Sequence, residues 1–312
     1  MLLSKLKIIS RESPLAMWQA RHVSTGLRLQ YPGLEVEIIA IKTRADRFLD
    51  TSLESLGGKG VFVKELEQAL LDKKADLAVH SMKDVTIDLP DALSLPVVLK
   101  REDVRDAFVS NQFQRLEDLP EKARVGTSSL RRQCQLRALR PDLEITDIRG
   151  NIGTRLKKLD EGQYDALILA AAGIKRLGLG DRVGTYLEPG RIVPAIGQGA
   201  LGIEIRGGDN GVLEMIRFLD DEHTHMCVSA ERALSRRLNG GCHVPIAAHA
   251  EIDAAQLSMI ALVGRVDGSE IICSAINGPA VQAGNLGKRL GAELLDKGAG
   301  TILQEITGGT SE

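Results

Sequence analysis

The chain has 312 residues, enough for two or three domains and a sizeable hydrophobic core. A net charge of −2 gives no overall attraction for polyanions, and an aromatic content of 3% leaves few side chains on which nucleic-acid bases stack. No apolar stretch approaches the roughly 20 residues of a membrane-spanning helix, and the four cysteines show no Cys-x-x-Cys spacing. We therefore expect a cytoplasmic protein with reduced thiols that binds neither nucleic acid nor membranes.

The first part of the chain alternates strands with helices. Strands are predicted over 5–12, 34–41 and 75–80. After the first strand, Ser13 and Pro14 form an N-cap and first-turn pair that opens a helix, so Arg11 and Ser13 lie at a strand-to-helix junction. The third strand leads into Ser81-Met82-Lys83-Asp84. Because ligands of open α/β sheets bind at the carboxyl ends of strands, these residues are candidates for a site.

Three glycines surround one lysine in Gly57-Gly58-Lys59-Gly60, at the end of a polar stretch that starts at Thr43. This composition is typical of a mobile loop that closes over a site. A solvated lysine ahead of a helix over 61–73 explains the same residues, and both interpretations stay open.

A second series of strands and helices follows a domain crossing that is predicted at 96–103. Its strands are predicted over 123–126, 143–148 and 165–171. Each of them leads into basic residues, the last into Lys175 and Arg176. Glycines between Pro194 and Gly202 then indicate a second crossing back to the first domain.

Basic residues are concentrated in this second series. Between Lys122 and Lys158 there are ten Lys or Arg against three Asp or Glu. Hydroxyl, amide and guanidinium groups gather at two predicted helix N-termini, which favour anions. They are Thr127, Ser129, Arg131 and Arg132 at one junction, and Asn151, Thr154 and Arg155 at the other. A solvated basic face would explain Lys157 and Lys158 but not these clusters, so we predict an anion site.

The last part of the chain has a different pattern. A helix is predicted over 223–238 and another over about 280–297. Between them, strands are predicted over 246–252, 257–266 and 270–276, and Asp267-Gly268 marks a hairpin. These elements predict a small α+β domain.

A short loop in this domain presents Cys242. Gly240 and Gly241 allow positive φ and a close approach to a ligand, and Pro245 ends local regularity. The loop alone favours a turn with a packed thiol, and the anion site makes a thiol that carries a group covalently the better interpretation. The nearby His223, His225 and Cys227 bring few ligands together on a helix, and we expect no metal site.

Asp84 is a carboxylate in what we expect to be a cationic cleft. It either pairs with an arginine and caps the next turn, or faces the cleft. In the second case it is the one nearby acid that can exchange protons or balance a developing cation.

In their order along the chain, these motifs resemble the porphobilinogen deaminase family, also called hydroxymethylbilane synthase. The matching stretches are Ile9-Ser10-Arg11-Glu12-Ser13-Pro14-Leu15-Ala16, Gly57-Gly58-Lys59-Gly60, Ala78-Val79-His80-Ser81-Met82-Lys83-Asp84, Gly126-Thr127-Ser128-Ser129-Leu130-Arg131-Arg132, Arg149-Gly150-Asn151 with Thr154-Arg155-Leu156, and Gly240-Gly241-Cys242.

The resemblance implies an α/β fold with two domains similar to the halves of type II periplasmic binding proteins, plus a small C-terminal α+β domain. We expect domain 1 to comprise 1–98 and 200–218, domain 2 to comprise 104–194, and domain 3, with Cys242, to comprise 222–312. A monomer is expected. The alternative, a non-enzymatic anion-binding protein of the periplasmic type, does not account for the third domain and its Gly-Gly-Cys loop.

The resemblance also implies a transferase of haem biosynthesis that joins four porphobilinogen molecules head to tail into hydroxymethylbilane and releases ammonia. Its primer would be a dipyrromethane cofactor, held by a thioether to Cys242, and Asp84 would be the catalytic carboxylate. The residues expected to bind the cofactor are Lys83, Thr127, Ser129, Arg131, Arg132 and Arg155. Those expected to bind substrate are Arg11, Ser13, Lys59, Arg149, Arg155 and Arg176. Each pyrrole carries two carboxylates, so a chain of six rings carries about twelve negative charges, which agrees with several arginines.

Overall fold

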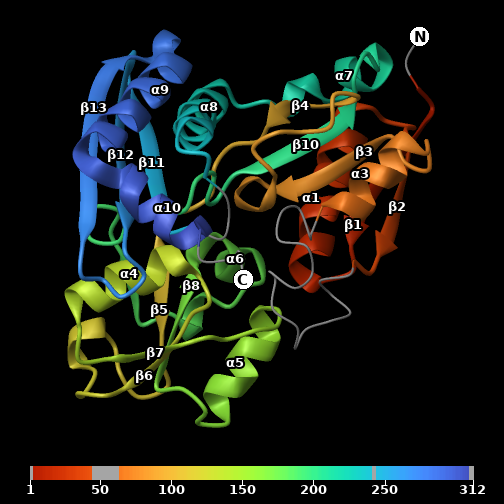
Figure 1. Cartoon of the computed structure of the whole chain (residues 1–312). Coiled ribbons are helices and arrows are strands. Elements are labelled where there is room, and N and C mark those ends of the chain that lie inside the picture. Colours follow the sequence, from red (N-terminus) through yellow and green to blue (C-terminus); the bar gives the residue numbers. More distant parts are fainter. Residues whose placement is uncertain (1–2, 44–62, 241–243, 309–312) are drawn as a thin grey trace. The chain divides into compact units, whose positions relative to one another are not determined.

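The structure is a computed structural model that describes residues 3–43, 63–240 and 244–308. The chain forms two compact units (Figure 1): unit 1 combines Met1–Glu102 with Ala200–His225, and unit 2 combines Asp103–Gly199 with Met226–Glu312. The two predicted crossings fall at these boundaries. Unit 2 joins the segments that we expect to form domains 2 and 3, each of which has its own sheet. The division into three domains stays a prediction.

The sheet of unit 1 has five strands in the order β2-β1-β3-β10-β4. The strands are β1 (Lys5–Arg11), β2 (Glu35–Ile41), β3 (Leu77–Ser81), β4 (Leu93–Val98) and β10 (Leu201–Arg206). β1 is parallel to β2 and β3, whereas β10 runs antiparallel between β3 and β4. The segment that returns to unit 1 therefore lies beside the strand that leads to Asp84.

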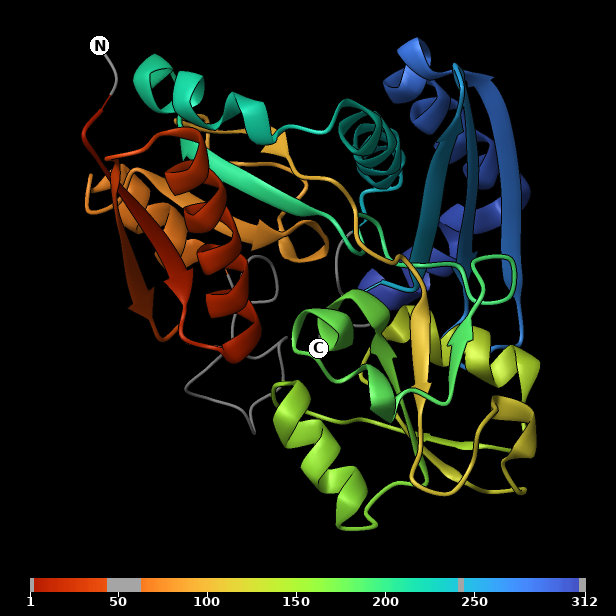
Figure 2. The ribbon, with the colours of Figure 1, turned by 180° about the vertical axis from the view of Figure 1, so that it is seen from behind.

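Helices cover both faces of this sheet (Figures 1 and 2). They are α1 (Pro14–Gln30), α3 (Lys64–Leu71) and α7 (Asn210–Ile216). Successive residues of a strand point to opposite faces, so Leu6 and Ile8 pack with α1 and α7 while Ile9 packs with α3. Burying each of these side chains stabilises the fold by about 2 kcal/mol.

The first sheet of unit 2 has the order β7-β6-β8-β5-β9. Its strands are β5 (Asp106–Val109), β6 (Arg124–Gly126), β7 (Glu144–Thr146), β8 (Ala166–Ala170) and β9 (Thr185–Leu187), and its helices are α4 (Leu130–Leu139), α5 (Ile152–Asp160) and α6 (Ala171–Arg176). β6 is parallel to β7 and β8, and β5 is antiparallel to β8 and β9. Each of the two five-stranded sheets thus has four strands that run in one direction and one antiparallel strand, β10 or β5, between two of them.

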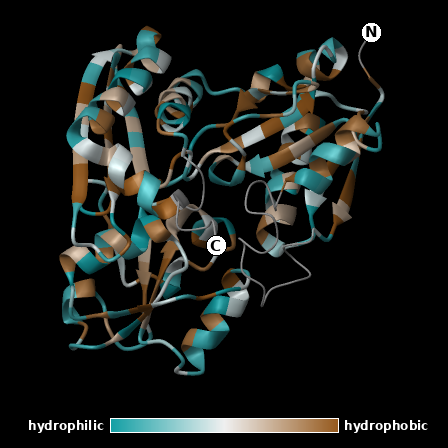
Figure 3. Ribbon diagram, in the orientation of Figure 1, coloured by the Kyte–Doolittle hydropathy of each residue, from teal (hydrophilic) through white to brown (hydrophobic). Residues whose placement is uncertain are grey.

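The second sheet of unit 2 is an antiparallel meander in the order β11-β12-β13. The elements of this region are α8 (Glu222–Arg237), β11 (Ile246–Asp253), β12 (Gln256–Gly264), β13 (Ile271–Pro279), α9 (Ala283–Leu294) and α10 (Gly300–Gly308). The predicted hairpin is confirmed, because Gly268 has φ +78° and Arg265 N–H donates to the carbonyl of Glu270 at 2.8 Å. In Figure 3 the helices of this region carry hydrophobic residues beside hydrophilic ones, and the buried cluster includes Leu234, Leu286 and Leu290.

The α/β class with a small C-terminal α+β region is confirmed. Within the described part of the chain, no helix has the length and apolar sequence needed to cross a membrane.

Candidate functional site

A pocket of unit 1 lies at the carboxyl ends of β1 and β3, beside the N-terminus of α1. Its lining includes Arg11 and Ser13 from the first strand-to-helix motif and Asp84 from the motif after the third predicted strand. The lining also includes His80 and Ser81, the last two residues of β3. The structure therefore brings the predicted acid together with two predicted substrate ligands.

Ser13 is the N-cap of α1, as its sequence position predicts. Its Oγ accepts a hydrogen bond from Ala16 N–H at 3.3 Å, and Pro14 occupies the first turn, where its missing N–H costs nothing. Further along the helix, Gln19 Nε2 donates to Ser81 Oγ at 2.9 Å. α1 is thereby joined to the end of β3, which fixes two walls of the pocket to each other.

Lys83 and Asp84 lie on a single turn of 3₁₀-helix, Met82–Asp84, that follows β3 directly. Both side chains are half-buried, while Met82 between them and the strand is 2% exposed. The N–H of Met82 donates to the carbonyl of Ala200 at 3.0 Å, and the N–H of Val85 donates to the carbonyl of Met82 at 3.3 Å. The turn that carries the predicted acid is thus held by a buried side chain and by backbone hydrogen bonds.

In unit 2 the predicted anion ligands follow the carboxyl ends of β6, β7 and β8. These strands are parallel, so the three ends lie at one edge of the sheet. Ser128 joins two of the junctions, because its Oγ donates to the carbonyl of Ile148 at 2.8 Å and accepts from Ile148 N–H at 3.0 Å. Thr127, Ser129, Arg131 and Arg132 belong to the β6–α4 junction, Arg149 and Arg155 to the β7–α5 junction, and Arg176 to the end of α6.

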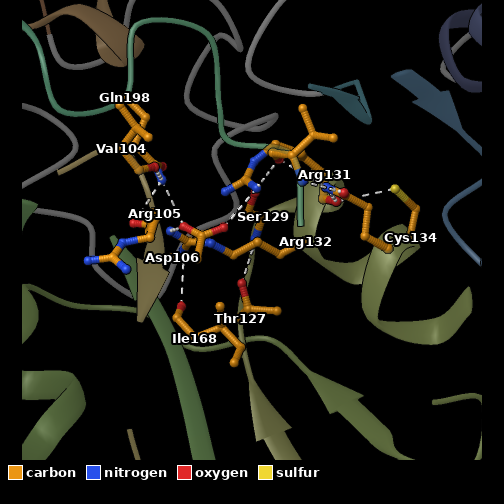
Figure 4. A network of polar contacts seen from close by, with 12 residues as sticks. Val104, Arg105, Asp106, Thr127, Ser129, Arg131, Arg132, Cys134, Ile168 and Gln198 are labelled. Carbon is orange, nitrogen blue, oxygen red and sulfur yellow. Dashed lines mark hydrogen bonds and ion pairs between the residues drawn. The ribbon is translucent and has the colours of Figure 1, made fainter. Parts of the chain in front are cut away.

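Arg131 and Arg132 converge on one buried carboxylate, that of Asp106 at the start of β5 (Figure 4). Arg131 Nη1 lies 2.8 Å from Asp106 Oδ2, and Arg132 Nη2 lies 2.7 Å from Oδ1. The two guanidinium groups also donate to backbone carbonyls, of Val193 at 2.7 Å and of Ile168 at 3.0 Å. All three charged residues are almost completely enclosed.

This cluster holds two positive charges and one negative charge. Burial alone would raise the pKa of Asp106, but the charges of Arg131 and Arg132 outweigh it and hold that pKa well below its usual range. Burial lowers the pKa of Arg131, because the charged form loses solvation. Within the described part of the chain, the Nε atoms of both arginines are buried without a hydrogen-bond partner. Among the described residues the cluster therefore has an excess of positive charge and unused donors, which supports the prediction of an anion site.

Asp106 and Gln198 were not identified from the sequence. Gln198 Nε2 donates to Asp106 Oδ1 at 2.9 Å and to the carbonyl of Val104 at 2.7 Å (Figure 4). A carboxylate that opens the apolar run Asp106-Ala107-Phe108-Val109 is the signal that could have indicated a buried ion pair.

The β7–α5 junction is shaped by Gly150, which has φ +108°. The carbonyl of Gly150 accepts a hydrogen bond from Arg155 Nε at 2.8 Å, and Asn151 is the N-cap of α5 through a bond of 2.9 Å from Thr154 N–H. Arg149 is half-buried at the same junction. The positive φ turns the chain so that Arg149 and Arg155 flank one helix N-terminus.

Arg176 contacts the second crossing segment. Its Nη2 donates to the carbonyl of Gly199 at 2.7 Å, where the chain has φ +86°. Lys59 and Cys242 lie outside the described residues, so their predicted roles stay predictions.

No three His, Cys, Asp or Glu side chains in the described ranges form a group that could hold a metal ion. In the helix considered for that role, His225 contacts Asp220 at 2.8 Å and Cys227 is buried.

Two family models match the chain. Residues 6–214 match porphobilinogen deaminase, dipyromethane cofactor binding domain, and residues 225–296 match porphobilinogen deaminase, C-terminal domain. Among solved structures, the chain is similar to a nutrient-binding protein from Burkholderia cenocepacia bound to methionine, with 13% identity, a TM-score of 0.44, and coverage of 68% of this chain and 90% of that chain. It is also similar to the periplasmic aliphatic sulphonate binding protein from Escherichia coli, with 16% identity, a TM-score of 0.41, and coverage of 76% and 71%.

Proposed function

The chain belongs to the porphobilinogen deaminase family, and from this premise we propose how its residues perform the family's reaction. The two matches cover nearly the whole chain, and they are the observation that carries the function. The chain is an enzyme of tetrapyrrole biosynthesis that condenses four porphobilinogen molecules head to tail into hydroxymethylbilane, with release of ammonia, on a dipyrromethane cofactor. Its reaction class is that of a transferase.

Asp84 is the catalytic carboxylate in this proposal. The support is its place in the pocket of unit 1 beside Arg11 and Ser13, on a turn held by hydrogen bonds. Positive charge develops on the substrate as ammonia leaves, and a carboxylate stabilises that charge, which an arginine would not. The same carboxylate can move a proton at the reacting centre.

The buried arginines of unit 2 fit the carboxylates of dipyrromethane. Arg131 and Arg132 share one counter-charge, and their two Nε donors have no partner among the residues that the structure describes, so a ligand carboxylate would supply the missing acceptor. When bound, the cofactor would supply the free pyrrole carbon to which the first substrate unit is added. Asp106 orients both guanidinium groups before the ligand arrives, which lowers the cost of ordering them.

The remaining roles follow the family pattern. Cys242 holds the cofactor through a thioether. Lys83, Thr127, Ser129 and Arg155 bind the acetate and propionate groups of the cofactor, together with the arginine pair. Arg11, Ser13, Lys59, Arg149, Arg155 and Arg176 bind the substrate and the growing chain. The three-domain division, a monomeric state and a cytoplasmic location belong to the same proposal.

The substitution Asp84→Asn tests the central role. We expect kcat to fall by about 10²–10⁴-fold, the range for a lost general acid or base, while the protein keeps its cofactor and binds porphobilinogen. Ammonia release, intact mass and substrate binding are measured on one preparation. Asp91→Asn, an exposed carboxylate outside the pocket lining, is the control and should leave kcat unchanged. Turnover near the wild-type rate in Asp84→Asn would remove its catalytic role.

A further inference from the structure

We propose that strand β10 positions the turn that carries Lys83 and Asp84, with Gly202 and Glu204 as positioning residues for the reaction. The inference rests on the proposed role of Asp84. β10 reaches this place from a distant part of the sequence, and neither residue belongs to the motifs on which the resemblance is based.

The backbone of β10 holds the end of β3 in register. Leu201 pairs with Ser81 and Gly202 pairs with His80 in the antiparallel ladder. Directly beyond the ladder, the carbonyl of Ala200 accepts the hydrogen bond from Met82 N–H at 3.0 Å. The first residue of the catalytic turn is therefore still bound to the segment that leads into β10.

Gly202 provides the space that Met82 fills. A Cβ built on Gly202 would overlap Met82 Sδ and lie 3.1 Å from two methyl carbons of Leu95. Met82 is 2% exposed, so its side chain has no solvent into which to move. Any side chain at position 202 must displace Met82, which immediately precedes Lys83 and Asp84.

Glu204 forms the second contact, with the imidazole of His80. His80 Nε2 lies 2.9 Å from Glu204 Oε2, and the two side chains are 4% and 1% exposed. Glu204 Oε1 is buried with no hydrogen-bond partner in the described ranges, where His80 is therefore the hydrogen-bonding group that compensates this carboxylate. His80 also lines the pocket that contains Asp84. The pair thus connects β10 with a wall of the pocket.

A buried carboxylate with one partner costs stability, and an apolar pair of similar volume would cost less. Glu67 of α3, 8% exposed, adds to this cost, because burial and the charge of Glu204 both raise its pKa. An arrangement that is unfavourable for folding and lies under the pocket indicates a function, which we infer to be fixing the direction in which β3 enters the turn.

The test uses Gly202→Ala, Glu204→Leu and Glu204→Gln. We expect Gly202→Ala and Glu204→Leu to lower kcat by up to about 10²-fold, the effect of moving a catalytic group such as the Asp84 carboxylate by roughly 1 Å. The KM for porphobilinogen should stay within about twofold of wild type. Glu204→Gln keeps a hydrogen-bonding group opposite His80 and should lose less. Met82→Ala in the Gly202→Ala background removes the overlap and should recover part of kcat.

Amide exchange of residues 81–85 gives a readout that is independent of turnover. The amide of Met82 is hydrogen-bonded to Ala200 and that of Val85 to Met82. Both amides should exchange faster in Gly202→Ala and Glu204→Leu than in wild type, because a displaced turn weakens these hydrogen bonds. Asp76→Asn is the matched control. It weakens the ion pair with Arg206 at 3.3 Å, at the opposite end of β3 and β10, and should cost stability without changing kcat or exchange at 81–85.

Normal kcat per folded, cofactor-loaded molecule in Gly202→Ala and Glu204→Leu would overturn the proposal, as would equal losses of kcat in Asp76→Asn. Asp84→Asn is measured in the same assay. If Asp84→Asn keeps turnover, the proposed catalytic role of Asp84 is wrong. If Asp84→Asn loses turnover while Gly202→Ala and Glu204→Leu keep it, only the positioning role of Gly202 and Glu204 is wrong.

Discussion

At the scale of single residues, the charge balance around Asp106 supports the proposed anion site. Removing two guanidinium groups from water is unfavourable, and one carboxylate compensates it only in part. The buried excess of positive charge destabilises the folded state, and a bound carboxylate ligand would compensate that charge. Ser13 as an N-cap could be predicted, because the signal lies within three residues. Asp106 could not, because its partners lie 26 and 92 positions away.

Asp106→Asn should destabilise unit 2 by about 3–5 kcal/mol at pH 7, because it leaves buried guanidinium groups without a counter-charge. The pKa of Asp106 is depressed in the fold, so its stabilising effect is full above the unfolded pKa of about 3.9 and is lost as the pH falls through the folded value. The difference between variant and wild type should therefore be constant from pH 8 to 5 and shrink below pH 4. Urea unfolding followed by circular dichroism measures it.

Asp142→Asn serves as the control for this experiment. Asp142 pairs with Arg140 at the surface, where solvent screens the charges, and its removal should change stability much less. Equal effects of the two substitutions would show that the buried cluster does not depend on Asp106.

Thiol accessibility tests the proposed thioether. Burial raises the pKa of Cys134 to about 11 and Cys227 is buried, so in the folded protein only Cys273 among the described cysteines should react with a thiol reagent at pH 8. After unfolding, a chain with four cysteines should show three reactive thiols if the cofactor alkylates Cys242 as proposed. Four thiols in freshly purified, active protein would contradict the attachment at Cys242.

At the scale of elements, the predicted site residues lie at strand-to-helix junctions, and most of these junctions could be predicted. The motifs at the ends of β6 and β7 combine glycine, hydroxyl or amide, and basic residues within a few positions, and those at the ends of β1 and β3 combine serine with a basic residue, so each is a local signal. The position of β10 between β3 and β4 could not be predicted, because the pairing joins residues more than 100 positions apart. That is why Gly202 and Glu204 carry no sequence signal of their role.

The C-terminal helix was predicted in the right place but with the wrong extent. Instead of one helix over 280–297, α9 ends at Leu294, a π-helical segment covers Leu295–Ala299, and α10 follows. Gly298 has φ +100°, which interrupts the helix although the apolar pattern continues through it. Periodicity alone does not reveal such a break.

At the scale of the whole molecule, the C-terminal sheet supports the helix that carries the arginine pair. Arg137 of α4 donates from Nη1 to the carbonyl of Val266 at 2.6 Å, and Cys134 packs against Gly264. Two segments that the sequence predicts as separate domains therefore pack as one unit. The N-terminal end of α4 carries Arg131 and Arg132, and its other end contacts the β12–β13 hairpin.

Gly268→Ala tests whether this contact stabilises α4. Gly268 has φ +78°, and a Cβ there would lie 2.6 Å from the backbone nitrogen of Ala138. Gly162→Ala is a matched control, since Gly162 has φ +72° and, apart from its chain neighbours, no described residue comes within 4 Å of the added Cβ. Both variants should lose about 1 kcal/mol to the positive φ. Gly268→Ala should lose a further 1–3 kcal/mol, roughly, from the clash.

The residues at which stability is lost in Gly268→Ala distinguish a contact that stabilises α4 from strain confined to the hairpin. Amide exchange should rise in residues 130–139 as well as in 265–270 for Gly268→Ala, and near residue 162 alone for the control. A rise confined to the hairpin, or equal losses of stability in the two variants, would show that α4 does not depend on it. If α4 loosens, the geometry of Arg131 and Arg132 loosens with it, and cofactor loading measured by intact mass should fall in Gly268→Ala but not in Gly162→Ala.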